Sequence, residues 1–171
     1  FPAISSSDLS VNFILTAADL RDLIDATRFA ISTEETRYYL NGIYLHKAGD
    51  GNLCAVATDG HRLALTCQAL PSGASQMPPV ILPRKVVGEL RKLLDDYDGN
   101  VSVGLSETRA EFGFGAVRLT SKLIDGTFPD YTRVIPAGND RIMQVDAAFF
   151  SAAVDRVSTI SSEKSRSVKM G

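Results

Sequence analysis

Thr58-Asp59-Gly60-His61-Arg62-Leu63 is the stretch that decides the fold. Apolar residues alternate with others along 53–57 before it and along 63–65 after it, as in strands that bury one face. An Asp-Gly pair between two such runs predicts a β-hairpin, because glycine accepts a positive φ at little steric cost. On the pattern alone the stretch is a turn, but a turn that presents a histidine and an arginine.

Two other polar and aromatic runs accompany this hairpin. They are Arg37-Tyr38-Tyr39-Leu40-Asn41-Gly42 and Phe128-Pro129-Asp130-Tyr131-Thr132-Arg133-Val134. Together the three runs resemble the middle domain of the bacterial DNA polymerase III β subunit, the sliding-clamp family, and the resemblance extends over essentially the whole chain. It implies domains in which two helices face the central hole of a ring and sheets lie outside.

Composition sets the broad class of protein. The chain has 171 residues, enough for one domain or for one domain and a fragment of another. Its 44% hydrophobic and 22% charged content is typical of a soluble globular protein. No apolar run approaches the roughly 20 residues of a membrane span, and the first residues lack the pattern of a secretory signal. Because the chain does not begin with Met and stops abruptly at Gly171, we expect a piece of a longer protein.

Two cysteines, Cys54 and Cys67, are too few for a disulfide framework or a cysteine metal site. A hairpin centred on Gly60-His61 would place them opposite one another, whereas a turn at Asp59-Gly60 puts them out of register. We therefore expect two buried, reduced thiols.

The chain repeats a βα unit followed by a run of strands. In the first unit a strand at 11–15 leads to a helix over 17–31, with Thr16 as N-cap and Asp19 completing a capping box. One side of this helix is predicted to be buried, at Leu20, Leu23, Ile24, Thr27, Ala30 and Ile31. Strands are expected at 38–46, 53–58 and 62–68, and a linker at 71–79.

The second unit follows the same order. A strand opens at 80–82, Pro83 suits the first helical position, and the helix runs to about Asp96. Its predicted apolar face comprises Val86, Val87, Leu90, Leu93 and Leu94. Strands are expected at 101–105, 109–114 and 116–121, and a connector at 127–140. A third unit begins with a strand at 142–145 and a helix over 147–161 capped by Asp146, and breaks off at 167–170.

The units open roughly 60 to 70 residues apart, which indicates internal duplication. We predict an α+β fold of duplicated β-α-β-β-β units, with two helices on one face of antiparallel sheets. With the resemblance, this is the DNA clamp fold. The expected domains are 1–138, a middle clamp domain preceded by a short connector at 1–10, and 139–171, the truncated start of a third clamp domain.

Basic residues recur seven positions apart on both helices, so they share helix faces about 10 Å apart along the axis. They are Arg21 with Arg28, Arg84 with Arg91, and Lys85 with Lys92. Such spacing suits a surface that faces phosphates without reading bases, although interleaved acidic residues also fit an ordinary solvated face. The net charge of −2 does not itself predict nucleic-acid binding. The resemblance implies that these helices line a DNA channel.

The run at Arg37-Tyr38-Tyr39 is expected on an extended strand, where the two tyrosines point to opposite faces and the exposed one can stack on a base. In the family this loop approaches DNA. Three positions before Arg37 the family commonly has a neutral polar residue, but this chain has Glu34, which repels phosphate.

The resemblance also implies a groove for short partner peptides that carry a Gln-containing segment with aliphatic and aromatic ends. Matching positions are Leu40, Thr58, Gly60, His61, Arg62, Leu63, Pro129, Arg133 and Val134. The chemistry fits, because the leucines, Pro129 and Val134 form an apolar floor and the two arginines polar edges. The other wall would come from the end of the third domain, which this chain lacks.

Catalysis is disfavoured by the inventory of side chains. His61 has only His46 as a second histidine, no Ser-His-Asp set stands out, and Asp59 with His61 on one hairpin is too little for zinc. Two alternatives stay open, a small metal-dependent hydrolase using Asp59 and His61, and a stand-alone peptide-binding module.

The implied function is that of a non-catalytic processivity factor in bacterial chromosomal replication. The resemblance implies a cytoplasmic, nucleoid-associated protein that encircles duplex DNA without sequence preference. The implied partners are the DNA polymerase III catalytic subunit, the clamp loader and other proteins with a clamp-binding motif. The full-length protein would form a head-to-tail homodimer ring, which this piece would not. No metal or other cofactor is implied.

Overall fold

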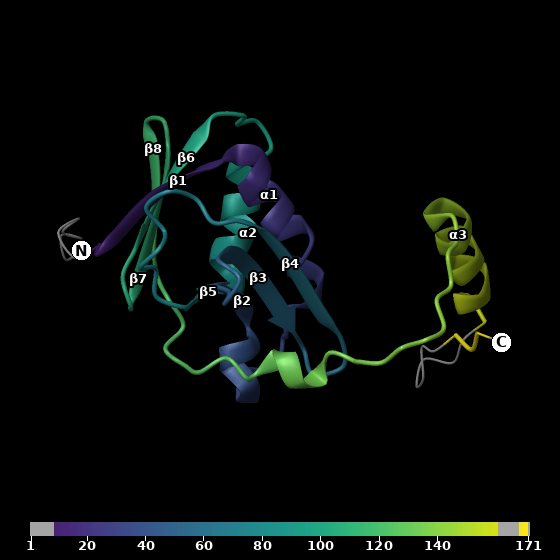
Figure 1. The fold of residues 1–171 in the computed structure, drawn as a ribbon. Coiled ribbons are helices and arrows are strands. Elements are labelled where there is room, and N and C mark those ends of the chain that lie inside the picture. The colour runs from purple at the N-terminus through teal and green to yellow at the C-terminus, as the bar shows by residue number, and fades with distance from the viewer. Residues whose placement is uncertain (1–8, 161–167, 171) are drawn as a thin grey trace. The chain divides into compact units, whose positions relative to one another are not determined.

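The computed structural model describes residues 9–160 and 168–170 and divides the chain into two compact units, Phe1–Pro129 and Asp130–Gly171 (Figure 1). Each unit is described by itself. No helix in the described residues is both long enough and apolar enough to cross a membrane. The first unit contains two helices and two four-stranded antiparallel sheets, which agrees with the predicted α+β class.

The first unit contains the predicted β-α-β-β-β order of elements twice. Its first half comprises β1 (Val11–Thr16), α1 (Ala17–Asp25), β2 (Gly42–Lys47), β3 (Asn52–Thr58) and β4 (Leu63–Ala69). Its second half comprises β5 (Val80–Pro83), α2 (Arg84–Leu93), β6 (Asn100–Leu105), β7 (Arg109–Phe114) and β8 (Val117–Lys122). Three short 3-10 helices supplement them, η2 (Arg28–Ala30), η3 (Glu35–Leu40) and, in the second unit, η4 (Tyr131–Val134).

The two halves exchange their first strands. The sheets have the orders β1-β6-β7-β8 and β4-β3-β2-β5, so β1 joins the strands of the second half and β5 joins those of the first. Equivalent backbone bonds mark the symmetry, since Ala17 N donates to Gly99 O at 2.9 Å and Arg84 N donates to Asn41 O at 2.8 Å. Neither half can complete its sheet alone, so the duplication is a structural requirement of the unit.

One hydrophobic core holds both halves together. The helices α1 and α2 lie beside one another, with the strands of one sheet to either side (Figure 1). Strand β1 alternates strictly and sends Val11, Phe13 and Leu15 into the core. The predicted helix faces are buried as expected, fully at Leu20, Leu23, Ile24, Val87, Leu90 and Leu94, and partly at Val86 and Leu93. Burial of such side chains is the main source of stability, at about 1.5–3 kcal/mol each.

The first helix is shorter than its apolar period predicts. The predicted N-cap is confirmed, because Thr16 Oγ1 accepts a hydrogen bond from Asp19 N at 3.0 Å. The predicted end is wrong, because α1 ends at Asp25 instead of Ile31. Beyond it, the buried hydroxyl of Thr27 donates to Leu23 O at 2.7 Å, and the chain tightens into η2. A threonine that bonds back to the preceding turn competes with the helical pattern, which explains the early end. Ile31 is still buried, now from the following segment.

The expected strand at 38–46 begins late. Residues 35–40 form η3, so Tyr38 and Tyr39 are on a 3-10 helix and the prediction of an extended Tyr-Tyr pair is wrong. Local bonds account for this, since Asn41 Nδ2 donates to Glu34 O at 3.1 Å and Ser32 N to Leu40 O at 3.1 Å. Strand β2 starts at Gly42, where an added Cβ would lie 2.1 Å from Leu82 O. Only glycine allows β5 to approach this closely.

The second helix departs from expectation only at its ends. Pro83 is the N-cap of α2 and the last residue of β5, one position earlier than the predicted first helical position. The helix ends at Leu93, whereas the pattern predicted Asp96. A proline there suits both elements, because it lacks the N–H that neither a helix start nor the end of this edge strand needs.

Cys54 and Cys67 form a disulfide, so the prediction of two buried, reduced thiols is wrong. The loop between β3 and β4 has four residues, 59–62, and is centred on Gly60-His61. This register places the two cysteines directly opposite one another, with a Cα–Cα distance of 4.1 Å. The Asp-Gly pair suggested a two-residue turn, which would place Cys54 opposite Leu65. The four-residue loop shifts the pairing by two residues and brings Cys54 opposite Cys67.

The second unit carries η4 and a helix, α3 (Ala147–Ser158). Asp146 is its N-cap as predicted, since its carboxylate accepts from Phe149 N at 2.8 Å. The expected strand at 142–145 is absent from the described residues of this unit, where Ile142 is 90% exposed. A strand needs a pairing partner to be stable, and none is present among those residues. The helix ends at Ser158, so the predicted extent to 161 is too long. Of the predicted break-off at 167–170, residue 167 lies outside the described residues.

Candidate functional site

The hairpin tip is organised by the carboxylate of Asp59. Its Oδ1 accepts from His61 N at 2.9 Å and from Arg62 N at 3.0 Å, and its Oδ2 accepts from Arg62 Nε at 3.0 Å. Burial works against the charged form, but these bonds outweigh it and hold the pKa of Asp59 below its ordinary value. Thr58 Oγ1 completes the loop by accepting from Gly60 N at 3.1 Å and donating to Arg62 O at 2.7 Å. The loop is therefore ordered by its own side chains.

This ordered loop presents polar groups to solvent. His61 and Arg62 are exposed, while Leu63 at the start of β4 is half-buried. The Arg62 guanidinium lies 5.7 Å from the ring centroid of Phe29, a cation–π distance. Phe29 comes from η2 and is itself 56% exposed. Sequence reasoning did not identify Phe29, because nothing in its own neighbourhood indicates that the hairpin approaches it.

Arg37, on η3, contacts the backbone of the hairpin tip and stabilises it. Its Nη2 donates to Asp59 O at 3.2 Å, and its guanidinium makes two contacts of 2.8 Å with the Glu34 carboxylate. The hydrogen bond with Glu34 raises the pKa of Arg37, and the same bond lowers the pKa of Glu34. Gly60 has φ +89°, and a Cβ there would lie 2.6 Å from Arg37 Nη1. Glycine is needed at the tip for both its backbone conformation and the room it leaves for Arg37.

The remaining predicted groove residues lie in different parts of the chain. Leu40, at the end of η3, is buried. Pro129 is exposed and ends the first unit, whereas Arg133 and Val134 belong to η4 in the second unit. There Asp130 caps η4 and pairs with Arg133 Nε at 2.8 Å, and the hydroxyl of Thr132 holds the pKa of Asp130 below its ordinary value. Val134 is 67% exposed. The structure thus gathers Thr58, Gly60, His61, Arg62 and Leu63 at one tip.

Several of the predicted DNA-facing arginines already have protein partners. Arg21 Nη2 donates to Leu94 O at 2.7 Å and pairs with Asp98 at 3.2 Å, so it caps the C-terminal end of α2. Arg91 pairs with Asp25 on α1 at 2.8 Å and with Asp95. Arg28 lies on η2, beyond the end of α1, so the predicted helix face shared by Arg21 and Arg28 is wrong. It pairs with the same Asp25 at 3.1 Å. The bonds from Arg21 to Leu94 O and from Arg91 to Asp25 tie α1 to α2, and the ion pairs together neutralise part of the basic surface.

The other basic side chains are more available. Lys92 is exposed and pairs with Glu89 at 3.0 Å. Within residues 9–160 and 168–170, neither Arg84 nor Lys85 makes an ion pair, and both are exposed. They border an open hollow that also includes Ser32 and Tyr38. Tyr38 is 54% exposed, and its ring packs edge-to-face against Tyr39 with centroids 5.8 Å apart.

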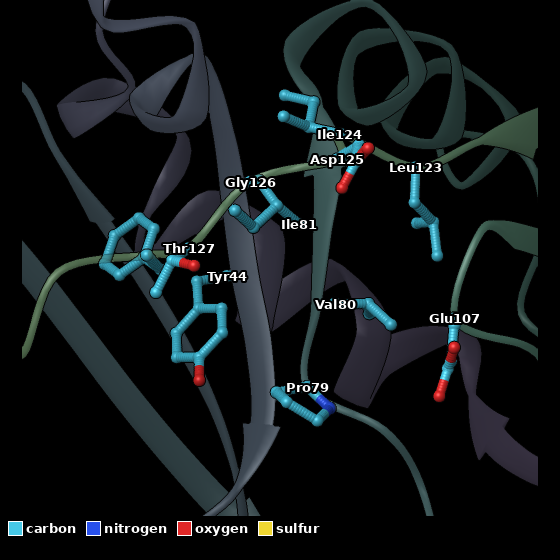
Figure 2. Close-up of a pocket in the computed structure, with 11 residues that line it drawn as sticks. Tyr44, Pro79, Val80, Ile81, Glu107, Leu123, Ile124, Asp125, Gly126 and Thr127 are labelled. Carbon is cyan, nitrogen blue, oxygen red and sulfur yellow. The ribbon is translucent and has the colours of Figure 1, made fainter.

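A separate cavity of about 220 Å³ lies between β5 and the segment that follows β8 (Figure 2). Figure 2 shows Tyr44 and Thr127 to one side of Val80 and Glu107 and Leu123 to the other. Phe128 stacks on Tyr44 with ring centroids 4.7 Å apart, and burial raises the pKa of Tyr44. The full lining comprises Tyr44, Pro79, Val80, Ile81, Glu107, Leu123, Ile124, Asp125, Gly126, Thr127 and Phe128. No sequence motif indicated this cavity, because its walls come from segments far apart in the chain.

The geometry at Asp59 and His61 does not resemble a metal centre. Both carboxylate oxygens of Asp59 are occupied by bonds within the loop. Among the residues that the structure describes, no group of three or more His, Cys, Asp or Glu side chains is placed to hold a metal ion. The tip instead offers an exposed cation and imidazole beside a half-buried leucine, which suits the binding of a peptide or another polyatomic ligand.

Comparison with known proteins shows a clear relationship. The family model described as the DNA polymerase III beta subunit, central domain, matches residues 14–130. The "Beta sliding clamp" of Caulobacter vibrioides (strain NA1000 / CB15N) is 54% identical over 173 residues, covering 99% of this chain and 46% of the relative. The protein of the same name from Escherichia coli (strain K12) is 38% identical over 174 residues, with the same shares covered. The chain therefore spans about half the length of these curated relatives.

Solved structures agree with the sequence comparisons. A DnaN sliding clamp from Bartonella birtlesii, bound to griselimycin, superposes with a TM-score of 0.92 at 57% identity, covering 97% of this chain and 45% of that one. The β sliding clamp of Caulobacter crescentus gives 0.91 at 53% identity, covering 96% and 45%. The exchanged-strand fold described above is thus shared with these proteins.

Proposed function

The chain belongs to the family of the DNA polymerase III β subunit, central domain, and we propose that it serves as part of a bacterial sliding clamp. In this proposal the whole protein is a non-catalytic processivity factor in the bacterial cytoplasm, associated with the nucleoid. It encircles duplex DNA as a homodimer ring and tethers the polymerase catalytic subunit, the clamp loader and other proteins with a clamp-binding motif. The observation that carries the proposal is 54% identity to a β sliding clamp over 99% of the chain.

The domain assignment is part of the proposal. Residues 1–138 would be the middle clamp domain with its leading connector, and 139–171 the start of the third. Two boundaries near this division support it, the end of the family match at residue 130 and the end of the first compact unit at Pro129. Self-contained packing on the N-terminal side of this boundary is what a clamp domain with its own core requires.

We place the peptide-binding groove at the hairpin tip, with Leu40, Pro129, Arg133 and Val134 as the further contributors. Support comes from the tip itself, where Asp59 and Arg37 order the loop before any ligand arrives. A pre-ordered loop loses little conformational entropy on binding, so exposed Arg62 and His61 can act as fixed polar contacts beside Leu63. The partner would be an extended Gln-containing segment with aliphatic and aromatic ends.

We place the DNA path along α1, α2 and the loop at 37–39. Arg84, Lys85 and Lys92 supply the most available charge, whereas Arg21, Arg28, Arg37 and Arg91 are engaged by acidic partners or carbonyls. Arginines that are already paired with protein groups are less available to DNA phosphates, so the intrinsic affinity of the chain for DNA should be low and strongly dependent on salt. Low affinity suits a clamp, because topology rather than contact holds a ring on DNA.

Calorimetry with a synthetic clamp-type peptide tests the groove. We expect the 171-residue chain to bind weakly, because the wall from the third domain is missing, and Leu63→Asp to abolish binding by adding an unpaired carboxylate to an apolar contact. Val117→Asp is the matched control, since Val117 begins the corresponding strand of the other hairpin and is likewise accessible. Equal binding by both variants and the parent chain would contradict the proposal that the peptide-binding groove lies at this tip.

A further inference from the structure

Three residues with reactive side chains lie in one row across the second sheet. His46 on β2 is opposite Cys54 on β3, and Cys54 is opposite Cys67 on β4. Directly opposed residues share a face of the sheet, and this face is not the one that carries Leu53 and Ala55 into the core. The Cys54–Cys67 disulfide therefore lies on the outer face, with an imidazole as its neighbour in the row.

The two cysteines differ in accessibility. Cys54 is buried, whereas Cys67 is exposed. Thiol–disulfide exchange requires a thiolate to reach one sulfur of the bond, and one accessible partner is sufficient. Attack can therefore be directed at Cys67 while the sheet stays folded.

Strand β4 depends on this bond more than its neighbours do. It lies at the edge of the sheet and pairs only with β3 in the order β4-β3-β2-β5. Of its residues Leu63–Ala69, only Ala64 is buried, whereas β3 buries five. Packing therefore holds β4 weakly, and the disulfide is its covalent connection to the sheet interior. Leu63 is the first residue of this strand and Arg62 is the loop residue that precedes it.

We propose that Cys54–Cys67 is a reversible redox modification site that tethers edge strand β4 beneath the hairpin tip. The role assigned to the tip and the reducing compartment both rest on the function proposed above. In cytosolic proteins, disulfides are usually transient and redox-sensing, because thiol reductants act on any accessible bond. A disulfide with one exposed cysteine, in the hairpin that carries the binding loop and four cross-strand pairs from that loop, fits that behaviour better than a permanent structural bond.

The exchange is balanced as a two-electron step with a dithiol. One thiolate of the dithiol attacks Sγ of Cys67, the Cys54 sulfur leaves as a thiolate, and a mixed disulfide remains on Cys67. The second thiolate of the dithiol then attacks its own sulfur in that mixed disulfide and releases Cys67. The two protons of the dithiol finish on Cys54 and Cys67, and the dithiol becomes a cyclic or linked disulfide. Oxidation by a small-molecule disulfide such as glutathione disulfide runs the same exchange backwards.

The bond itself is tested by mass spectrometry on the full 171-residue chain. The native protein is equilibrated in glutathione buffers of graded ratio and quenched with acid, and only then denatured and alkylated with a maleimide, so that the buried Cys54 is also labelled. We expect no label at the oxidising end, two labels at the reducing end, and a reversible transition between them without unfolding. Two labels at every ratio, or a bond that opens only in denaturant, would overturn the proposal.

The tether is tested by hydrogen exchange. We expect reduction to raise amide exchange across 63–69 at least several-fold, to leave β7 and β8 unchanged, and to lower the Tm by about 5–15 °C. Cys67→Ser should match the reduced protein in both buffers, and Cys67→Ala serves as a second variant in case the hydroxyl perturbs folding. Unchanged exchange across 63–69 on reduction would refute the tether.

Measuring peptide binding by the reduced and the oxidised chain distinguishes failure of this proposal from failure of the proposed function on which it rests. We expect the reduced chain to bind a clamp-type peptide about three- to tenfold more weakly than the oxidised chain. Binding by neither form would contradict the groove, while the mass and exchange results would still decide the redox site. Equal binding by both forms, with β4 loosened in the reduced one, would show that the modification does not reach the tip and would overturn that part of the proposal.

Discussion

The hairpins β3–β4 and β7–β8 occupy equivalent places in the two halves of the duplicated unit, yet they end differently. The first closes with four residues, 59–62, and the second with two, Gly115-Ala116. In the first, Asp59 collects three hydrogen bonds and presents His61 and Arg62, whereas the second is a tight turn with Gly115 at φ +59°. The scaffold is therefore shared, and the two extra residues make the candidate site.

The largest expected effect tests the shared scaffold. Leu53 on β3 and Phe112 on β7 are both fully buried in the same core. Leu53→Ala should lower the free energy of unfolding by about 2–5 kcal/mol and Phe112→Ala by about 3–5 kcal/mol, because each leaves a cavity. Urea titration followed by circular dichroism measures both. A loss under about 1 kcal/mol for one alone would mean that the two hairpins do not share one cooperative core.

Substituting the two glycines compares the loops directly. Gly60→Ala should lower the free energy of unfolding by about 2 kcal/mol, since it combines a positive φ with the collision against Arg37. Gly115→Ala should cost about 1 kcal/mol, because its Cβ would meet nothing within 4 Å.

A double-mutant cycle with Arg37→Ala separates the two causes. Removing the guanidinium should reduce the cost of Gly60→Ala to about that of Gly115→Ala, and should leave the cost of Gly115→Ala unchanged. Coupling between Arg37 and Gly115, or none between Arg37 and Gly60, would contradict the contact behind the tip.

Asp59→Ala should lower the free energy of unfolding by about 1–2 kcal/mol, because backbone donors of His61 and Arg62 lose their acceptor. Substituting Ala116 in the other loop by serine is the control and should change stability by less than about 0.5 kcal/mol. Thermal unfolding of the three chains in parallel gives the comparison. A neutral Asp59→Ala would mean that the loop is ordered by something other than this carboxylate.

The smallest expected effect is a dependence on pH. The folded pKa of Asp59 lies below its unfolded value of about 3.9, so its charge stabilises the fold above that pH and the contribution disappears as pH falls through the folded pKa. Because the group is near the surface, the effect is modest. Asp59→Asn should flatten this part of the stability profile below about pH 4. An unchanged profile would assign the acid sensitivity to other carboxylates whose pKa is lowered, such as Glu34 or Asp130.

Much of the fold was predictable because its signals are local. The N-cap at Thr16 and the apolar stripe of α1 depend on residues within one or two helical turns. The duplicated order of elements was readable for the same reason, and so was a hairpin at 58–63. The prediction of a strand at Tyr38-Tyr39 was wrong, because the side-chain hydrogen bond from Asn41 to Glu34 O competes with the strand preference of the aromatic pair.

The sequence by itself determined the order of helices and strands in the first unit, which faces of its two helices are apolar and that one hairpin carries a polar tip. Only the tertiary structure decided the exchange of β1 and β5 between sheets, the pairing of Cys54 with Cys67 and the position of Arg37 behind Gly60. The physical reason is the distance along the sequence over which each kind of interaction acts. Local hydrogen bonding and periodicity are properties of neighbouring residues, whereas strand register changes with a single loop residue and an arginine finds its partner only after distant segments have packed.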